Sequence, residues 1–388
     1  MSKNARLQEP SALVDFERRW KRVRNLMRQH DVAAVVISEN GRSRYLTGYQ
    51  RYFTATHVPP VHAVVVTLYD GPFLLLPAHV VLGPGEHRAK QIVPLGFGED
   101  ARASAIGALL RNAGAAKDRV AVEFGFLSVR YLDKLAAHMP DAALIDVEPI
   151  MSSATMIKFP DEIAILREAA RLVDEGVAAA VAKCVRGASE LDIAARASAR
   201  MLKLGAEFIN HMTVRAGSHA SGNFPFPTQR RLADGECVQI DIGCVVGGYV
   251  SDTNRTVVVG RASADQKALF DVGQRMLEAA IEAVRPGVSA SMVYKAAFGV
   301  AERAGMEARV SIPFAGHGIG LSLQEPPFID ASAATILQPG MVLALEPGVY
   351  AEGVGGSRPE EMILVTDTGC EVLTKFPRDA DLEMARHC

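Results

Sequence analysis

Hydrophobic and polar positions along the first 150 residues follow two alternating patterns. Residues 14–30 are charged and amphipathic, which predicts a helix, whereas residues 32–38 (VAAVVIS) form a β-branched run with the length of a buried strand. The same patterns predict helices at 101–112 and 128–138 and strands at 63–69, 73–76 and 120–124. Alternation of this kind is typical of an α/β layer with a largely buried sheet.

The pattern changes near residues 150–160. The segment MSSATMIKFPDE contains a Ser/Thr cluster and Pro160, and Asp161 and Glu162 follow, where a helix N-terminus favours acidic side chains. Beyond it we expect helices at 162–183, 189–204 and 264–284 and strands at 237–244, 253–259, 341–345 and 361–366. A chain of 388 residues is too long for one ordinary core. We therefore predict an α/β domain over residues 1–155 and an α+β domain with an antiparallel-leaning sheet over residues 156–388.

Composition and charge narrow the classes of function. The hydrophobic fraction is 49%, the charged fraction is 22% and the net charge is −2, without a long Lys/Arg run, which argues against a nucleic-acid partner. The most apolar stretch, residues 61–83, is interrupted by charged residues and prolines and predicts two strands, not a membrane span. The N-terminus has no apolar signal-peptide core, and the five cysteines are scattered without a CxxC pair. These features favour a cytoplasmic protein with reduced thiols and no membrane partner.

Five potential metal ligands lie in the second half of the chain, each at the edge of a predicted strand or in a glycine turn. They are Asp241 in IDIG, Asp252 in SDTNRT, His317 in GHGIG, Glu346 in LEPGVY and Glu360 in RPEEM. Singly, each could be a turn carboxylate, a surface ion pair or a core histidine. Together, four carboxylates and one imidazole carry too much negative charge to cluster without cations, and two divalent ions would neutralise them and activate a water. Mn²⁺, Co²⁺, Zn²⁺ and Fe²⁺ all suit such a ligand set.

The strings around these residues resemble those of a known family. IDIG, GGYVSDTNRT, GHGIGLSLQEPP, LQPGMVLALEPGVY and GSRPEEMILVT are similar to the motifs of the "pita-bread" metallopeptidases, which include methionine aminopeptidase, aminopeptidase P, prolidase and the related creatinase. The resemblance covers residues 158–375. Residues 12–150, with the weaker motif SRYLTGY, resemble the N-terminal domain of the creatinase/prolidase branch. The resemblance implies an α/β N-terminal domain followed by a catalytic domain of the pita-bread fold.

The resemblance also implies a role for each residue of the set. Asp241 and Asp252 would bind the first metal ion, His317 and Glu346 would complete the second, and Asp252 and Glu360 would bridge the two. An activated water would attack the scissile carbonyl, and Glu346 would accept its proton. Arg358 would pair with carboxylates, holding either Glu360 or an acid group of the substrate.

The chain departs from these peptidases at the two histidines that bind the substrate carbonyl. An ungapped count back from PTQRRL places Phe224 at the first position, and Gln324 replaces the second, seven residues after His317. Glutamine can donate a hydrogen bond but cannot shuttle protons, and phenylalanine can do neither. His211 and His219 lie close to Phe224 in the sequence. They either substitute for the two missing histidines or have ordinary loop roles.

These features lead to one main hypothesis and two alternatives. The main hypothesis is a dinuclear metallohydrolase that cleaves a C–N bond in a short peptide or small amide, with Xaa-Pro peptides as the default substrate. The alternatives are a non-peptide enzyme of the same fold, resembling creatinase or the lyases that act on dimethylsulfoniopropionate, and a catalytically inactive binding protein. The resemblance further implies a homodimer, and the aromatic segment at residues 49–62 either contacts the partner or is a surface loop.

Overall fold

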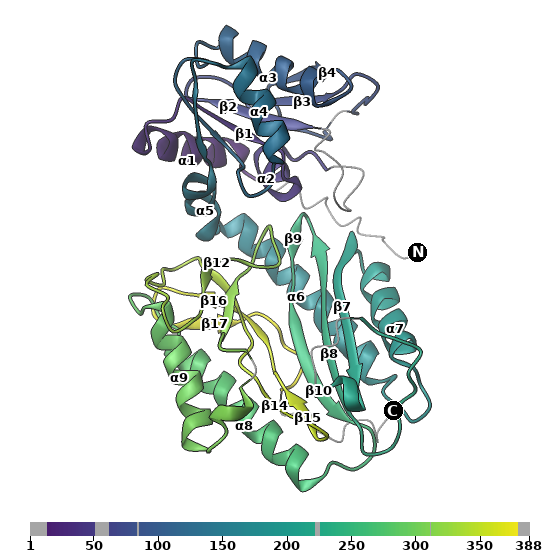
Figure 1. Ribbon diagram of the computed structural model, residues 1–388. Coiled ribbons are helices and arrows are strands. Elements are labelled where there is room, and N and C mark those ends of the chain that lie inside the picture. Colours follow the sequence, from purple (N-terminus) through teal and green to yellow (C-terminus); the bar gives the residue numbers. More distant parts are fainter. Residues whose placement is uncertain (1–13, 51–61, 84, 222–225, 311, 379–388) are drawn as a thin grey trace, which may run out of the picture. The chain divides into compact units, whose positions relative to one another are not determined.

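The computed structural model describes residues 14–50, 62–83, 85–221, 226–310 and 312–378. By its internal contacts the chain divides into two compact units, Met1–Thr155 and Met156–Cys388 (Figure 1). Residues 51–61 of the aromatic segment 49–62, which was expected either to contact a partner or to be a surface loop, lie outside the described residues, as does Phe224.

The first unit is an α/β layer built on a six-stranded sheet of order β4-β3-β2-β1-β5-β6. Strand β1 pairs with β2 in antiparallel and with β5 in parallel orientation, so the sheet is mixed. The strands are β1 (Ala34–Ile37), β2 (Ala63–Thr67), β3 (Phe73–Pro77), β4 (Gln91–Leu95), β5 (Arg119–Val122) and β6 (Ala143–Asp146). The helices are α1 (Phe16–Gln29), α2 (Asn40–Thr47), α3 (Glu99–Asn112), α4 (Val129–His138) and α5 (Glu148–Met156). Strand β1 is buried along its whole length, as its β-branched sequence predicts.

The second unit begins with two helices that pack on a short antiparallel sheet. Helix α6 (Pro160–Val181) has Pro at its first turn and acidic residues beside it, and helix α7 (Glu190–Lys203) begins with a capping box at Ser189. They contact strands β8 and β7 of a sheet of order β10-β8-β7, with β9 paired to β8. The strands are β7 (Phe208–Ala216), β8 (Cys237–Val246), β9 (Tyr249–Val250) and β10 (Thr253–Val258). Strand β7, which the sequence analysis did not predict, is central to the site.

The other half of this unit repeats the scheme of two helices and a sheet. Helices α8 (Ala264–Ala283) and α9 (Ala290–Arg303) pack against each other and enclose a hydrophobic core with the sheet of order β12-β11-β13-β16-β17. The strands are β11 (Gly316–Gly318), β12 (Glu325–Phe328), β13 (Val342–Leu345), β16 (Glu361–Val365) and β17 (Cys370–Val372), and a hairpin is formed by β14 (Val349–Ala351) and β15 (Gly355–Ser357). The two halves therefore bring two sheets into one unit (Figure 1).

The guanidinium of Arg255 links the two sheets of the second unit. It lies on β10, and its Nη2 is 2.8 Å from Oε1 of Glu361 on β16, while its Nη1 donates to the carbonyl oxygen of Glu360 at 2.7 Å. Both side chains are buried. A charged pair in this position fixes β16, and with it Glu360, relative to the neighbouring sheet.

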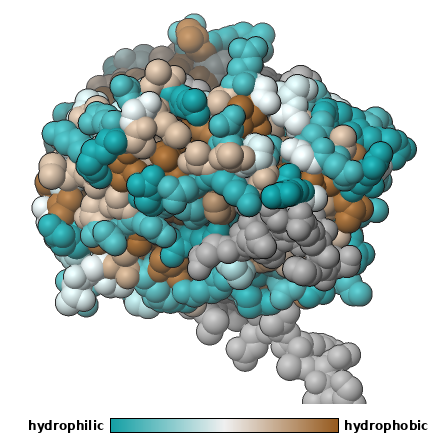
Figure 2. Space-filling model, turned by 90° about the horizontal axis from the view of Figure 1, so that it is seen from below, coloured by the Kyte–Doolittle hydropathy of each residue, from teal (hydrophilic) through white to brown (hydrophobic). Residues whose placement is uncertain are grey.

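On the face seen in Figure 2, hydrophilic side chains are interspersed with small hydrophobic areas. Within the described part of the chain, no helix is long and apolar enough to cross a membrane.

Candidate metal centre

Strand pairing brings three of the five predicted ligands together on the five-stranded sheet of the second unit. Strands β13 and β16 are antiparallel, with Leu345 opposite Glu361, so Glu346 just after β13 and Glu360 just before β16 emerge side by side. Strand β11 pairs with the other edge of β13 and carries His317 at its centre. The sequence separates these residues widely, but antiparallel pairing places them together.

The remaining two predicted ligands come from the smaller sheet. Asp241 lies in the middle of β8, with its apolar neighbours Ile240 and Ile242 buried on the opposite face, as the alternation predicts. Asp252 immediately precedes β10, whose first residue, Thr253, pairs with Ile242. Asp252 therefore extends from the next strand onto the same face as Asp241.

The imidazole of His317 faces two of these carboxylates. Its Nε2 is 3.2 Å from Glu346 Oε1 and 3.7 Å from Asp252 Oδ2. Its Nδ1 is 2.9 Å from the carbonyl oxygen of Gly318, which can only accept, so Nδ1 carries the proton. The lone pair of Nε2 is thereby directed to the carboxylates, which is the tautomer that a metal ligand requires. The ring of Phe314 stacks on His317 with 5.9 Å between centroids.

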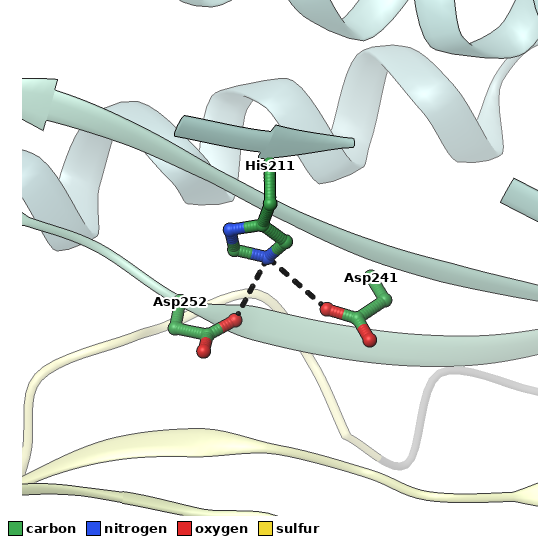
Figure 3. A group of neighbouring side chains, drawn as sticks. All are labelled: His211, Asp241 and Asp252. Atoms are coloured by element: carbon green, nitrogen blue, oxygen red, sulfur yellow. Dashed lines mark hydrogen bonds and ion pairs between the residues drawn. The ribbon is translucent and has the colours of Figure 1, made fainter. Parts of the chain in front are cut away.

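A second imidazole, His211 on β7, points toward Asp241 and Asp252 (Figure 3). Its Nε2 is 3.1 Å from Asp241 Oδ1 and 3.0 Å from Asp252 Oδ1. The sequence singled out His211 only as one of two nearby histidines. The structure brings it into direct contact with two of the predicted ligands.

A β-bulge in β7 orients His211 toward the cluster. Ile209 pairs with Cys244 and His211 with Gly243, so Asn210 is an extra residue with no partner on β8. After the bulge, His211, Thr213 and Arg215 share the face that carries Asp241.

Two guanidinium groups contact the same carboxylates. Arg358 donates from Nη2 to Asp241 Oδ2 and has its Nη1 3.2 Å from Glu346 Oε2, and Arg215 Nη2 is 3.9 Å from Asp241 Oδ2. Burial raises the pKa of Asp241, but the charge of Arg358 and the hydrogen bond from His211 outweigh it, and the pKa is lowered. Arg358 was expected to hold Glu360 or an acid group of the substrate, and the carboxylates that it contacts here are Asp241 and Glu346.

The described side chains leave negative charge and several buried polar atoms of the cluster without partners. Burial, together with the charges of Asp252, Glu346 and Asp241, raises the pKa of Glu360 well above its usual value. Among the described residues, Asp252 Oδ1, His317 Nε2 and both carboxylate oxygens of Glu360 are buried without a hydrogen-bond partner. Buried polar atoms are normally satisfied, and oxygens and an imidazole nitrogen directed at one another are metal donors. The residues therefore fit divalent cations.

The donor atoms fall into two overlapping groups. Those of His211, Asp241 and Asp252 lie within 4.8 Å of one another, and so do those of Asp252, His317 and Glu360. Asp252 belongs to both groups.

The other predicted site residues are placed differently. His219 lies away from the cluster, with its Nδ1 2.9 Å from Oε1 of the buried Glu190, which also accepts from the backbone of Ala216. Gln324 is exposed. Sequence reasoning missed Arg215 and Phe314. The polar–apolar alternation of HMTVRA, residues 211–216, was the available signal for Arg215, and nothing local indicated Phe314.

Gly243 makes room for the imidazole of His211. A Cβ at this position would lie 2.1 Å from the carbonyl oxygen of Ser251 and 2.5 Å from Cε1 of His211. We expect Gly243→Ala to lower the free energy of unfolding by about 1–3 kcal/mol, because strands and ring must move apart. Urea denaturation followed by circular dichroism measures the change. Gly369→Ala is the control, since nothing lies within 4 Å of a Cβ there. Equal stability of the two variants would contradict the crowding at Gly243.

Comparison with known proteins places this fold and cluster in one class, the metal-dependent hydrolases. Residues 164–367 match the model of metallopeptidase family M24, and residues 19–157 match the creatinase/prolidase N-terminal domain. The chain belongs to metallopeptidase family M24, in its creatinase/prolidase branch. The predicted fold class is confirmed, the protein is an enzyme of the metallohydrolase type, and the cluster described above supports divalent-metal binding.

Individual relatives agree with this assignment. The chain is 28% identical over 363 residues to a putative dipeptidase YkvY of Bacillus subtilis, covering 93% of this chain and 98% of the relative. It is 32% identical over 234 residues to the Xaa-Pro dipeptidase of Pyrococcus furiosus, covering 60% of this chain and 67% of the relative. Among solved structures, the dipeptidase PepE of Mycobacterium ulcerans superposes with a TM-score of 0.83 at 28% identity, covering 95% of this chain and 97% of that one.

Proposed function

We propose that the protein is a two-metal dipeptidase that hydrolyses short peptides, with Xaa-Pro dipeptides as the default substrates. Its similarity to proteins named dipeptidase and Xaa-Pro dipeptidase supports this class of substrate. Asp241 and Asp252 would hold the first ion, His317 and Glu346 would complete the second, and Asp252 and Glu360 would be shared.

The position of Asp252 is the observation that carries the two-ion proposal. Its Oδ1 lies 3.0 Å from His211 Nε2, which also contacts Asp241 Oδ1, whereas its Oδ2 lies 3.7 Å from His317 Nε2. A carboxylate with one oxygen directed at each donor group is suited to bridge two cations. Four carboxylates, with a charge of −4, would then be balanced by two divalent ions, with a charge of +4.

The chain's own residues supply orientation and proton transfer. When bound, the cations would polarise the scissile carbonyl and lower the pKa of the attacking water. Glu346 would accept the proton of that water, and Arg358, 3.2 Å from its Oε2, would hold the carboxylate in place. His317, with its Nδ1 proton committed to Gly318, would keep Nε2 directed into the site. Exclusion of water by the buried walls strengthens each of these interactions.

Metal content and turnover test the proposal. We expect protein purified without chelator, or reconstituted with Mn²⁺, to hold two divalent ions per chain by elemental analysis and to hydrolyse dipeptides only when loaded. Reconstituted wild type that binds no metal would contradict the site. Metal-loaded protein that hydrolyses no peptide would contradict the substrate class while leaving the site intact.

A second candidate function is metal-dependent action on a non-peptide substrate. Two observations favour it: the chain has Phe224 and Gln324 where related peptidases have substrate-binding histidines, and Gln324 is exposed. A panel of Xaa-Pro dipeptides and longer Xaa-Pro peptides separates the candidates. Turnover at an ordinary enzyme rate of about 10 s⁻¹ supports the dipeptidase. Weak turnover that Phe224→His/Gln324→His increases supports a pocket adapted to another small amide or to a lyase substrate.

The proposal also covers the identity of the metal ion, the oligomeric state and the cellular compartment. Mn²⁺ is the first metal to test, with Co²⁺, Zn²⁺ and Fe²⁺ as alternatives. The homodimer expectation rests on the resemblance, and light scattering at micromolar concentration that reports a monomer would overturn it. Free thiols at Cys184, Cys237, Cys244 and Cys370 are consistent with the cytoplasm.

A further inference from the structure

We propose that His211 is itself a metal ligand, so that the first ion is held by His211, Asp241 and Asp252, not by carboxylates alone. The inference rests on the proposed two-metal site and adds to it a ligand from β7. Two imidazoles would then flank Asp252. His211 Nε2 lies 3.0 Å from its Oδ1 (Figure 3), and His317 Nε2 lies 3.7 Å from its Oδ2.

The hydrogen-bond count around His211 favours a cation at this point. Nε2 can carry one proton, yet oxygens of two carboxylates approach it at 3.1 Å and 3.0 Å. Asp241 Oδ1 accepts the hydrogen bond, whereas Asp252 Oδ1 is buried and accepts none. A single N–H cannot satisfy both oxygens. A divalent ion bound by the Nε2 lone pair and the two oxygens satisfies all three donor atoms.

The far side of the ring has a partner that can fix the required tautomer. The side-chain amide of Asn210 lies 2.8 Å from His211 Nδ1, with its nitrogen nearer the ring. Rotating this amide by half a turn exchanges its nitrogen and oxygen at no steric cost, because the two atoms are nearly the same size. The amide oxygen then accepts the Nδ1 proton and leaves the Nε2 lone pair for a metal. His317 is already fixed in this way by the carbonyl oxygen of Gly318.

The backbone around His211 is shaped to place this ring in the cluster. The bulge at Asn210 directs both Asn210 and His211 to the same side, and Gly243 opposite provides the space that a Cβ would fill. An imidazole with an ordinary packing role needs none of these features. Their combination, next to two predicted ligands, is what a ligand position requires.

An imidazole at the first position changes which ions the site favours. Carboxylate-only positions suit Mn²⁺ and Mg²⁺, whereas imidazole suits Zn²⁺, Fe²⁺ and other later transition metals. With His211 and His317 each contributing one nitrogen, the two ions have similar donor sets. We therefore expect the preference for Co²⁺ or Zn²⁺ over Mn²⁺ to fall when His211 is replaced.

Cobalt titration of metal-depleted protein tests the inference without relying on activity. Calorimetry gives the number and affinity of the ions, and the visible absorption of Co²⁺ reports its ligands. The variants are His211→Gln, which retains an N–H near the position of Nε2 but is a poor ligand, and His211→Ala, which removes the ring. The control is His219→Asn, which keeps a donor near Nδ1 for Glu190 and lies outside the cluster.

The expected results differ for each variant. His211→Gln should bind one of two Co²⁺ ions at least about 10-fold more weakly, the lower end of the range for outer-shell partners, with an altered spectrum. His211→Ala should lose affinity for one of the two ions to at least the same extent, because it offers no side-chain donor at all. His219→Asn should match the wild type.

Three outcomes would decide against the inference. Wild-type affinity for both ions in His211→Gln, or in His211→Ala, means that His211 is not a ligand. Wild type that binds no Co²⁺, Mn²⁺ or Zn²⁺ refutes the proposed metal site itself and the inference with it. Circular dichroism identifies a misfolded variant, in which case the other His211 variant decides.

Discussion

Replacing Asp252 by asparagine is expected to remove both metal ions and, with them, the hydrolytic activity. Asp252 is the only residue common to the two donor groups of the described chain, so its loss affects both. Changing an outer-shell partner of a metal ligand typically costs 10–100-fold in metal affinity, and a shared ligand should cost at least about 100-fold. Elemental analysis and cobalt titration of Asp252→Asn against wild type measure the effect.

The same variant should also gain less stability when metal is added. Without metal, Asp252 repels Glu360 and attracts His211, raising the pKa of both, so these two effects of Asp252 on stability oppose each other. With saturating metal, wild type gains the binding free energy and the variant loses most of that gain. Asp265→Asn, an exposed residue at the start of α8, is the control that removes a carboxylate elsewhere. Wild-type metal binding by Asp252→Asn would rule out the shared-ligand arrangement.

Arg255→Met is expected to destabilise the second unit by up to about 3–5 kcal/mol, because it removes the buried cation of Glu361. Glu361 is almost fully buried, and of its two guanidinium partners only the less buried Arg378, with Nε 3.3 Å from Oε1, would remain. Arg255 also donates a hydrogen bond to the backbone carbonyl oxygen of Glu360. The loss should also loosen Glu360 and weaken metal binding. Urea denaturation at a fixed metal concentration measures the change in free energy of unfolding.

A double variant separates the uncompensated charge from a general packing defect. Arg255→Met/Glu361→Met removes both members of the pair and should be closer to wild type in stability than the single variant. The sole tryptophan, Trp20, lies in the first unit, so its fluorescence follows that unit while circular dichroism follows both. Only the dichroism transition should shift. Equal destabilisation of single and double variants would contradict the role assigned to this pair.

Local sequence patterns predicted several long helices and strands, but not every element that carries a residue of the site. Long amphipathic segments predicted helices α6 and α8, and the alternation in VQIDIG predicted both β8 and the face on which Asp241 lies. Helix α9 and strand β7 were missed. In β7, the alternating stretch from His211 to Ala216 is present, but the bulge at Asn210 breaks its phase with Phe208 and Ile209. A stretch of sequence that includes the bulge therefore shows no single period of polar and apolar residues.

Local patterns could not predict which of the site residues lie close together in the folded chain. His317 and Glu346 meet only because β11 and β13 pair, and β11 is three residues long. The resemblance to a known family supplied the grouping of the five predicted ligands. It could not supply His211, which lies outside that family pattern and became visible only through its contacts with Asp241 and Asp252.

The bulge in β7 also makes one position of the strand tolerant of a change in length. Ile209 and His211 pair with Cys244 and Gly243, which are neighbours on β8, so deletion of Asn210 would join them into a regular ladder. His211, Thr213 and Arg215 would stay on the face that carries Asp241, and only the amide beside His211 Nδ1 would be lost. A single-codon deletion elsewhere in the strand would reverse the facing of the residues on one side of it, so Asn210 marks the point at which relatives can differ in length by one residue and keep the ligand-bearing face.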